Sequence, residues 1–271
     1  MSGIFSMSAR SVIKRKTITD IKKMKGNEPV VCLTAYTAPV ARIADECAEL
    51  ILVGDSLGMV LYGMESTVPV SIEMMVHHGR AVVRSSQKAL VVIDMPFGSY
   101  QESRAAAFKN AARLMKDTGA SAVKLEGGAE MAETVAYLTA RGIPVMGHIG
   151  LQPQSVHAEG GYRVMGKSDK DYQRLVSDAL ALEKAGAFAL VLECVIPELA
   201  ADITGKLSIP TIGIGAGNAC DGQILVFEDM TGMTGQTPAK FVKQYARLFD
   251  PMAMAAREYA SEVKKRTFPG L

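Results

Sequence analysis

The sequence predicts a single (β/α)8 barrel, and three observations support this prediction. Eight short apolar runs rich in Val, Ile and Leu recur along the chain with helix-like stretches between them; such runs are typical of strands buried on both faces of a parallel sheet. Four acidic residues, Asp55, Asp94, Glu126 and Glu193, each follow one of these runs, where parallel α/β folds position their chemistry. The length of 271 residues and the apolar content of 48% suit one large core.

The first expected strand begins at Val30 and the last ends at Val226. In chain order the strands cover residues 30–34, 51–53, 90–93, 122–125, 144–147, 189–192, 210–214 and 223–226. The regular alternation of strands and helices favours a closed barrel, and a doubly wound open sheet is the alternative.

The stretches between the strands predict helices from apolar spacing and from glycine stop signals. Gly119, Gly142 and Gly186 each end an expected helix. Residues 152–170, rich in glycine and polar residues, predict a mobile loop over the barrel mouth. The expected helices cover residues 39–49, 72–84, 103–118, 130–141, 169–185 and 197–207, and the tail 238–265 predicts one or two more, with a break at Asp250-Pro251.

Residues 17–271 are expected to form one domain with C-terminal helices, because no linker or shift in composition divides them. Residues 1–16 precede it as an N-terminal arm, expected either to be disordered or to lead into the first strand. The arm is basic and free of acidic residues, which is also typical of a weak organellar transit peptide. The arm of a cytoplasmic enzyme is the simpler interpretation.

Charge and cysteine content argue against several classes of function. The formal net charge of +2 gives no reason to expect a nucleic-acid partner, and no apolar stretch approaches the roughly 20 residues that span a bilayer. The four cysteines show no C-x-x-C spacing and are expected to be reduced thiols. Cys194 follows Glu193 and is a candidate nucleophile, although no paired histidine motif supports that role.

Lys124 and Glu126 predict a pocket that holds both a cation and an anion. They are two residues apart on one expected strand, so both side chains lie on the same face, which is the interior of a barrel. Gly127 and Gly128 follow directly and let the backbone approach a bound ligand closely. A structural ion pair is the alternative interpretation.

Asp55, Asp94 and Glu126 supply hard oxygen donors close to three strand ends. Such donors suit Mg²⁺, which takes one or two protein carboxylates and completes its shell with water and ligand oxygens. Zinc is disfavoured because no histidine or cysteine cluster has ligand spacing. For Asp55 alone, a cap of the following helix is the alternative.

Glu193 and His148 are further candidates. Glu193 stands apart along the sequence and is the expected general base, with a water-mediated metal ligand as the alternative. His148 is expected either to hydrogen-bond a ligand or to support residues that do. His77 and His78 lie in an expected helix, where surface or core packing is favoured. Residues 213–218 are glycine-rich but lack the third glycine of a dinucleotide motif, so they predict a tight turn rather than an NAD site.

Several long motifs resemble those of the ketopantoate hydroxymethyltransferase family, in one register from Lys16 to Pro269. Long motifs in the right order are far more specific than a lone glycine motif. The matching stretches are VGDSLGM at 53–59, YG at 62–63, STVPV at 66–70, DMPF at 94–97, VKLEGG at 123–128, GHIGLQPQ at 147–154, LEC at 192–194 and IGIGAG at 212–217.

The resemblance implies a reaction, a cofactor and an assembly. The reaction is hydroxymethyl transfer from 5,10-methylenetetrahydrofolate to 3-methyl-2-oxobutanoate through a Mg²⁺-stabilised enolate. It gives 2-dehydropantoate, in the first step of pantothenate biosynthesis. The resemblance further implies a barrel of the phosphoenolpyruvate mutase/isocitrate lyase type and a cytoplasmic homodecamer.

The resemblance also implies roles for residues at matching motif positions. Glu193 is implied as the proton acceptor. The implied metal ligands are Asp55, Asp94 and Glu126. The implied contacts of the keto acid are Asp55, Ser56, Asp94 and Lys124.

Two rival interpretations accompany this one. A related metal-dependent carbon–carbon lyase or mutase would use similar enolate chemistry on another 2-oxo acid, without folate. A non-catalytic barrel would only bind a small carboxylate or serve as an assembly subunit. No aromatic cluster or basic stretch in the sequence indicates where folate would bind.

Overall fold

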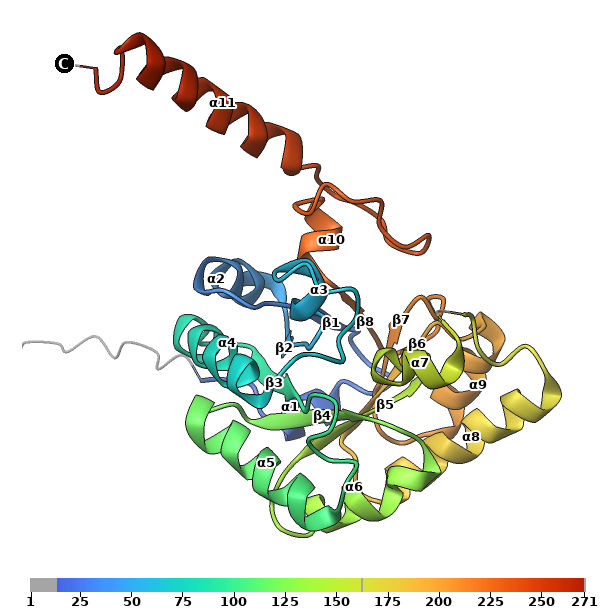
Figure 1. Cartoon of the computed structure of the whole chain (residues 1–271). Helices are drawn as coiled ribbons and strands as arrows, with labels where there is room; N and C mark the ends of the chain where they lie inside the picture. Colours follow the sequence, from blue (N-terminus) through green and yellow to red (C-terminus); the bar gives the residue numbers. More distant parts are fainter. Residues whose placement is uncertain (1–13, 162, 271) are drawn as a thin grey trace, which may run out of the picture.

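The computed structural model describes residues 14–161 and 163–270, and its centre is a closed barrel of eight parallel strands (Figure 1). Strands pair in chain order, and β8 closes the ring by pairing with β1. The predicted (β/α)8 fold is therefore confirmed and the open sheet is wrong. The strands are β1 Val30–Thr34, β2 Leu50–Val53, β3 Leu90–Asp94, β4 Ala122–Glu126, β5 Val145–Gly150, β6 Ala189–Glu193, β7 Thr211–Ile214 and β8 Gly222–Leu225.

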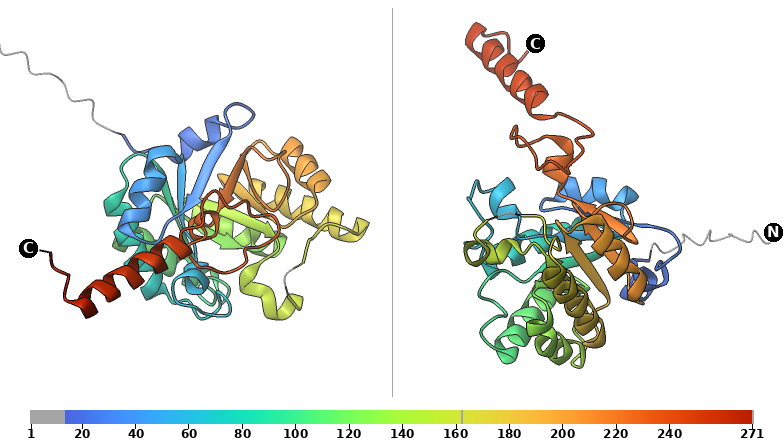
Figure 2. Two further views of the ribbon diagram at one scale, coloured as in Figure 1. Left: turned by 90° about the horizontal axis from the view of Figure 1, so that it is seen from above. Right: turned by 90° about the vertical axis from the view of Figure 1, so that its right-hand side faces the viewer.

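Helices connect the strands and cover the outside of the barrel (Figures 1 and 2). The side chains of Ser71, Ser103 and Ser168 cap α4, α5 and α8. Each serine oxygen accepts the backbone N–H of the residue three positions later. Gly119 ends α5 in the left-handed region, as its stop signal predicted. The helices are α1 Ile18–Lys23, α2 Ala38–Cys47, α3 Leu57–Val60, α4 Ile72–Ser85, α5 Arg104–Thr118, η1 Ala129–Met131, α6 Ala132–Thr139, η2 Pro153–Ser155, α7 Val156–Glu159, α8 Asp169–Lys184, α9 Pro197–Lys206, α10 Phe227–Thr231 and α11 Phe249–Lys265.

The C-terminal tail differs from its prediction. Residues 238–248 form no helix, and Asp250-Pro251 lies inside the first turn of α11, so the predicted break is wrong. Proline is compatible with a first turn because the N–H that it lacks has no acceptor within the helix. Helix α11 stands away from the barrel in Figure 1 and in the right view of Figure 2, and none of its residues is buried.

The predicted loop over the barrel mouth contains two short helical turns, η2 and α7. The backbone N–H of Met165 donates to the Cys194 carbonyl at 2.8 Å, and the N–H of Ile196 donates to the Met165 carbonyl at 3.1 Å. These bonds anchor the C-terminal part of the loop beside the end of β6. The mobility of residues 152–170 stays a prediction.

The N-terminal arm is described only at its end, because residues 1–13 lie outside the described residues. The Arg15 guanidinium donates to the backbone carbonyls of Val83, Ser86 and Ala89. The Lys16 N–H donates to the Lys88 carbonyl at 2.7 Å. Residues 15 and 16 are thus bound to the segment that joins α4 to β3.

The inside of the barrel is filled by side chains beneath the strand ends. On β4, Ala122 joins the interior cluster, whereas Val123 and Leu125 pack outward. Strand alternation then directs Lys124 and Glu126 inward, as predicted. The interior cluster consists of Ile21, Val30, Cys32, Leu50, Leu52, Leu90, Val92, Ala122, Met146, Phe188, Ala189, Val191, Ile212 and Ile224.

Among the described helices, none is both long and apolar enough to cross a membrane.

Candidate active site

One cavity at the carboxyl ends of the strands collects the candidate residues. It has a volume of about 390 Å³. Because parallel strands all end at this rim, side chains from distant parts of the sequence meet there. The candidates that line the cavity are Asp55, Ser56, Asp94, Lys124, Glu126, His148 and Glu193.

Lys124 and Asp94 form a buried ion pair between neighbouring strands. Lys124 Nζ lies 3.1 Å from Asp94 Oδ1, and the strand register places the two residues side by side. Burial lowers the pKa of Lys124, but the charges of Asp94, Glu126 and Asp55 outweigh it and raise that pKa above its usual value. The structural ion pair considered from the sequence therefore exists, but its partner is Asp94 rather than Glu126.

The acidic residues occupy an electrostatically unfavourable position. Burial raises the pKa of Asp55 well above its ordinary value, and the charges of Asp94 and Glu126 raise it further. Burial also raises the pKa of Asp94, against the opposing Lys124 charge and the Asp55 N–H, which donates to Asp94 Oδ2 at 3.0 Å. An added cation would stabilise the ionised forms of these side chains.

His148 lies between two carboxylates. Its Nδ1 is 3.5 Å from Glu126 Oε1, and its Nε2 is 3.1 Å from Glu193 Oε2. Burial and the nearby Lys124 charge lower the pKa of His148, but the bonds to Glu126 and Glu193 prevail and raise it to about 9. Burial likewise opposes ionisation of Glu126, but the hydrogen bond and charge of His148 outweigh it and lower the pKa of Glu126.

Glu193 is the last residue of β6, and a glycine on the neighbouring strand β5 gives its backbone room. Its side chain is 17% exposed, against 3% for Glu126 and 4% for Asp94. The register pairs Gly150 with Glu193, and a Cβ on Gly150 would lie 2.2 Å from the Glu193 carbonyl oxygen. Cys194, which follows, has a positive φ of 48°. The backbone is thus held in an unusual conformation around the expected base.

Ser56 stands at the start of α3 and shares a 2.7 Å hydrogen bond with the hydroxyl of buried Tyr36. Gly54 precedes Asp55 and Ser56, and a Cβ at position 54 would lie 2.9 Å from Ser56 Oγ. A side chain at position 54 would therefore crowd the Ser56 hydroxyl.

The donor set fits a hard divalent cation in part. Asp94 Oδ1 is buried without a hydrogen bond, although it faces the Lys124 ammonium. Within residues 14–161 and 163–270, no three Asp, Glu, His or Cys side chains are close enough together to hold a metal ion by themselves. Mg²⁺ does not need a complete protein cage, because it is usually bound by one or two carboxylates with water and substrate oxygens. The carboxylates can therefore supply part of its shell.

Comparison with known proteins decides the family. A family model described as ketopantoate hydroxymethyltransferase matches residues 15–271. The chain belongs to this family. The 3-methyl-2-oxobutanoate hydroxymethyltransferase of Rhizobium rhizogenes is 57% identical over 264 residues, which is 97% of each chain. The protein of the same name from Paramagnetospirillum magneticum is 56% identical over 264 residues, 97% of this chain and 96% of the relative. The chain is accordingly an enzyme of the transferase class.

Solved structures with low sequence identity to this chain share its fold. A phosphonopyruvate hydrolase in complex with oxalate and Mg²⁺ superposes with a TM-score of 0.61 at 14% identity, over 93% of this chain and 88% of that one. A 2,3-dimethylmalate lyase, a member of the PEP mutase/isocitrate lyase superfamily, gives 0.59 at 16% identity, over 94% and 89%. The predicted barrel type is confirmed.

His78 and the glycines of residues 213–218, which were not predicted to act in catalysis, have structural roles. His78 Nδ1 is 2.7 Å from the Tyr36 carbonyl, and its Nε2 is 2.9 Å from the Tyr62 hydroxyl. Gly215 and Gly217 have positive φ values of 63° and 76°, consistent with the tight turn expected in residues 213–218.

Sequence reasoning missed three residues that bond to the candidate residues: Gln154, Tyr100 and Tyr36. Gln154 donates to Asp55 and to Glu126, and the Tyr100 hydroxyl accepts the Glu126 N–H. Gln154 falls in the predicted loop 152–170, so the only sign of it was its place at the end of the 147–154 motif.

Proposed function

We propose that this enzyme transfers a hydroxymethyl group from 5,10-methylenetetrahydrofolate to 3-methyl-2-oxobutanoate, giving 2-dehydropantoate. The reaction would be the first step of pantothenate biosynthesis, in the cytoplasm. The observation that supports it best is the convergence of carboxylates, a lysine and a candidate base in one cavity, in a chain of this family.

Asp55, Asp94 and Glu126 would hold Mg²⁺. When bound, this ion would supply Lewis-acid stabilisation of the negative charge that develops on the keto oxygen. Lys124 adds a fixed positive charge beside Asp94, within 3.1 Å of its carboxylate. The Ser56 hydroxyl, oriented by Tyr36, can donate a hydrogen bond to an oxygen of the keto acid.

Glu193 would accept the proton from C3 of the keto acid. It lines the cavity, and its Oε2 lies 3.1 Å from His148 Nε2. The C3 carbon left with the electron pair would then bond to the methylene carbon as the bond from that carbon to one folate nitrogen breaks. Water would supply the hydroxyl oxygen as the bond to the second nitrogen breaks, and the protons released by C3 and by water would end on these two nitrogens of the departing tetrahydrofolate. The same cavity extends to residues 234–242, which gives room for the folate above the keto acid.

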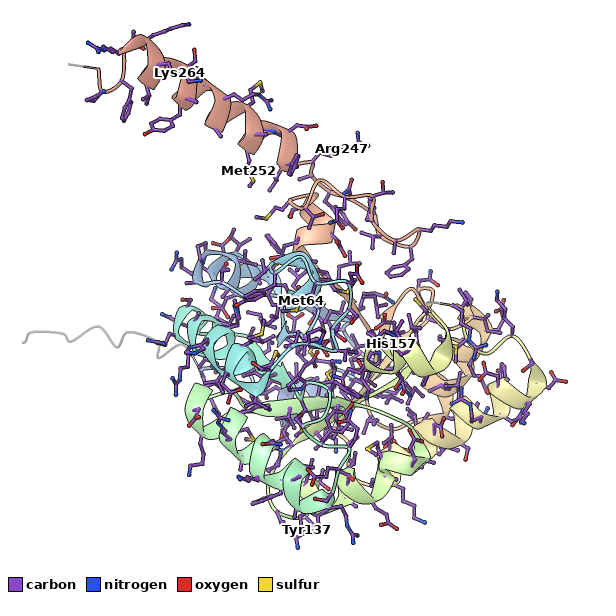
Figure 3. All side chains as sticks on the ribbon, viewed as in Figure 1. Met64, Tyr137, His157, Arg247, Met252 and Lys264 are labelled. Atoms are coloured by element: carbon purple, nitrogen blue, oxygen red, sulfur yellow. The ribbon has the colours of Figure 1, made fainter. Side chains whose placement is uncertain are left out.

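Homo-oligomerisation, with a homodecamer as the proposed state, is supported by helix α11. Figure 3 shows this helix projecting from the barrel with side chains on all sides, Met252 near its start and Lys264 near its end. Phe249, Met252, Tyr259 and Val263 are exposed and fall on one side of the helix by their spacing. Within the described chain this apolar stripe is not covered by the barrel, so a second copy is its proposed partner.

The decisive experiment is incubation with 3-methyl-2-oxobutanoate, Mg²⁺ and 5,10-methylenetetrahydrofolate, followed by product identification by NMR. We expect 2-dehydropantoate, and none when folate is omitted. Folate-independent cleavage or rearrangement of a 2-oxo acid would instead support the lyase or mutase alternative. Binding of the keto acid without conversion under all conditions would support a non-catalytic barrel.

A further inference from the structure

Gln154 is buried between two of the candidate metal ligands. Only 4% of it is exposed. Its backbone N–H donates to Glu126 Oε2 at 3.0 Å, and its side-chain Nε2 donates to Asp55 Oδ2 at 2.8 Å. One residue from η2, beyond β5, thus binds one oxygen on each of two carboxylates that come from β4 and from the end of β2.

The amide of Gln154 is held in one orientation. Its Nε2 also donates to the Met95 carbonyl at 2.9 Å, and its Oε1 accepts the Tyr100 hydroxyl at 2.7 Å. The Tyr100 hydroxyl in turn accepts the Glu126 N–H at 3.1 Å. A flipped amide would point its oxygen at a carboxylate and a carbonyl, which are both acceptors. The Glu126 N–H, the Tyr100 hydroxyl and the Gln154 side-chain amide therefore form a series of donors that ends at Asp55.

The neutrality of the amide suits the surroundings. Asp55, Asp94 and Glu126 are three buried carboxylates that repel one another in one cavity. A fourth carboxylate at position 154 would increase this repulsion, whereas an ammonium would occupy the place of a bound cation. An amide donates to the ionised carboxylate without changing the net charge of the site.

We propose that Gln154 is a positioning residue of the divalent-cation site, which fixes Asp55 and Glu126 by one oxygen each so that both carboxylates meet the cation in a set orientation. This proposal rests on the proposed function, because it concerns the same metal. Groups that orient metal ligands commonly contribute about 10- to 100-fold to metal affinity.

The test is Gln154→Met, which keeps side-chain length and the backbone N–H but removes the donor to Asp55. Mn²⁺ titrated calorimetrically into the protein without substrates should bind about 10- to 100-fold more weakly than to the wild type. Thermal unfolding of the same samples reports whether the fold is kept. Gln101→Met is the matched control, since Gln101 donates to Gln154 Oε1 at 3.3 Å but contacts no carboxylate of the site; its Mn²⁺ affinity should stay within about twofold.

If folded Gln154→Met binds Mn²⁺ with wild-type affinity, the positioning role of Gln154 is overturned, whereas the proposed function is unaffected. If that variant does not fold, Tyr100→Phe makes the same measurement, because it removes the hydroxyl between the Glu126 N–H and the Gln154 oxygen while keeping the ring. Weaker Mn²⁺ binding is expected there, and unchanged binding would again contradict the proposal. A wild-type protein that forms product but binds no divalent cation would overturn the metal part of the proposed function, and this proposal with it.

Discussion

Charge balance at the barrel mouth depends on a few buried residues. Asp55, Asp94 and Glu126 share the cavity with one lysine, whose ammonium contacts Asp94 at 3.1 Å. His148 is held between Glu126 and Glu193 and has its pKa raised to about 9 by those contacts, despite burial. The acidic groups therefore differ in their neighbours: Asp94 contacts Lys124, whereas Glu126 and Glu193 contact His148.

For Glu193→Gln we expect loss of exchange between the C3 proton of 3-methyl-2-oxobutanoate and deuterated water. The amide has nearly the same size but does not accept a proton at neutral pH, so keto-acid and metal binding should persist. Proton NMR of the C3 signal over time measures the exchange. Cys194→Ser is the control, because Cys194 lines the same cavity and should leave exchange intact. Normal exchange in Glu193→Gln would assign the base elsewhere.

Asp94→Asn should weaken Mg²⁺ binding by at least about tenfold, since the change removes a charged donor where even supporting groups have effects of that size. Calorimetric titration of Mg²⁺ measures it. Asp221→Asn is the matched comparison: Asp221 is also paired with a lysine, Lys25 at 2.8 Å, but at the opposite end of the barrel. Its Mg²⁺ affinity should be unchanged. Equal affinities for both variants would move the ligand assignment away from Asp94.

The contact between β5 and β6 positions the expected base. Gly150 pairs with Glu193 in the register and adopts a positive φ of 95°. The next residue continues the contact, because the Leu151 N–H donates to the Glu193 carbonyl at 2.8 Å. A side chain at position 150 would disturb both the strand end and the direction of the Glu193 carboxylate.

Gly150→Ala should lower the free energy of unfolding by about 1–3 kcal/mol more than Gly142→Ala does. Both glycines have positive φ, 95° and 81°. A Cβ at position 142 meets nothing within 4 Å, whereas at position 150 it would lie 2.2 Å from a backbone oxygen. Urea denaturation measures the free energy of unfolding of both variants, and the difference between their losses reports the close contact apart from the conformational cost. Equal losses would show that this contact does not affect stability.

The sequence allowed the strand order and the inward face of β4 to be predicted, because apolar periodicity marks each buried element. It did not allow Gln154 or Tyr36 to be found, because a polar side chain outside the strands and long helices acquires its role only when distant segments meet. Pro251 was misread for a local reason: proline marks a helix break or a first turn equally well, and only the start of α11 at Phe249 decides between them.

At the scale of the whole molecule, helix α11 has no buried residue among residues 14–161 and 163–270, so no described element covers it. After β8 the five-residue α10 is followed by residues that form no helix, and then by α11, which stands off the barrel (Figures 1 and 2). A helix of 17 residues with an apolar stripe is stable in water mainly when that stripe is covered.

The double change Met252→Glu with Tyr259→Glu should reduce the size of the assembly. Both side chains are more than half exposed within the single chain, and a second copy would bury them. Multi-angle light scattering should give the wild type several times the 28.9 kDa chain mass and the variant a smaller multiple. Glu258→Gln, on the opposite side of α11 by helical spacing, should leave the mass unchanged. A monomeric wild type would contradict the proposed assembly.

The packed apolar interior beneath Lys124 separates residues that stabilise the barrel from residues that carry the chemistry. Apolar layers from Ile21 upward fill the lower barrel, and the chemistry-bearing groups all sit above them at the other rim. Leu52, Val191 and Ile224 belong both to this cluster and to the lining of the cavity. Substitutions at the other members of the cluster should therefore alter heat tolerance without changing the ligand pocket. A laboratory seeking a more stable catalyst can search among the members of this cluster that lie outside the pocket, with the reactive end left untouched.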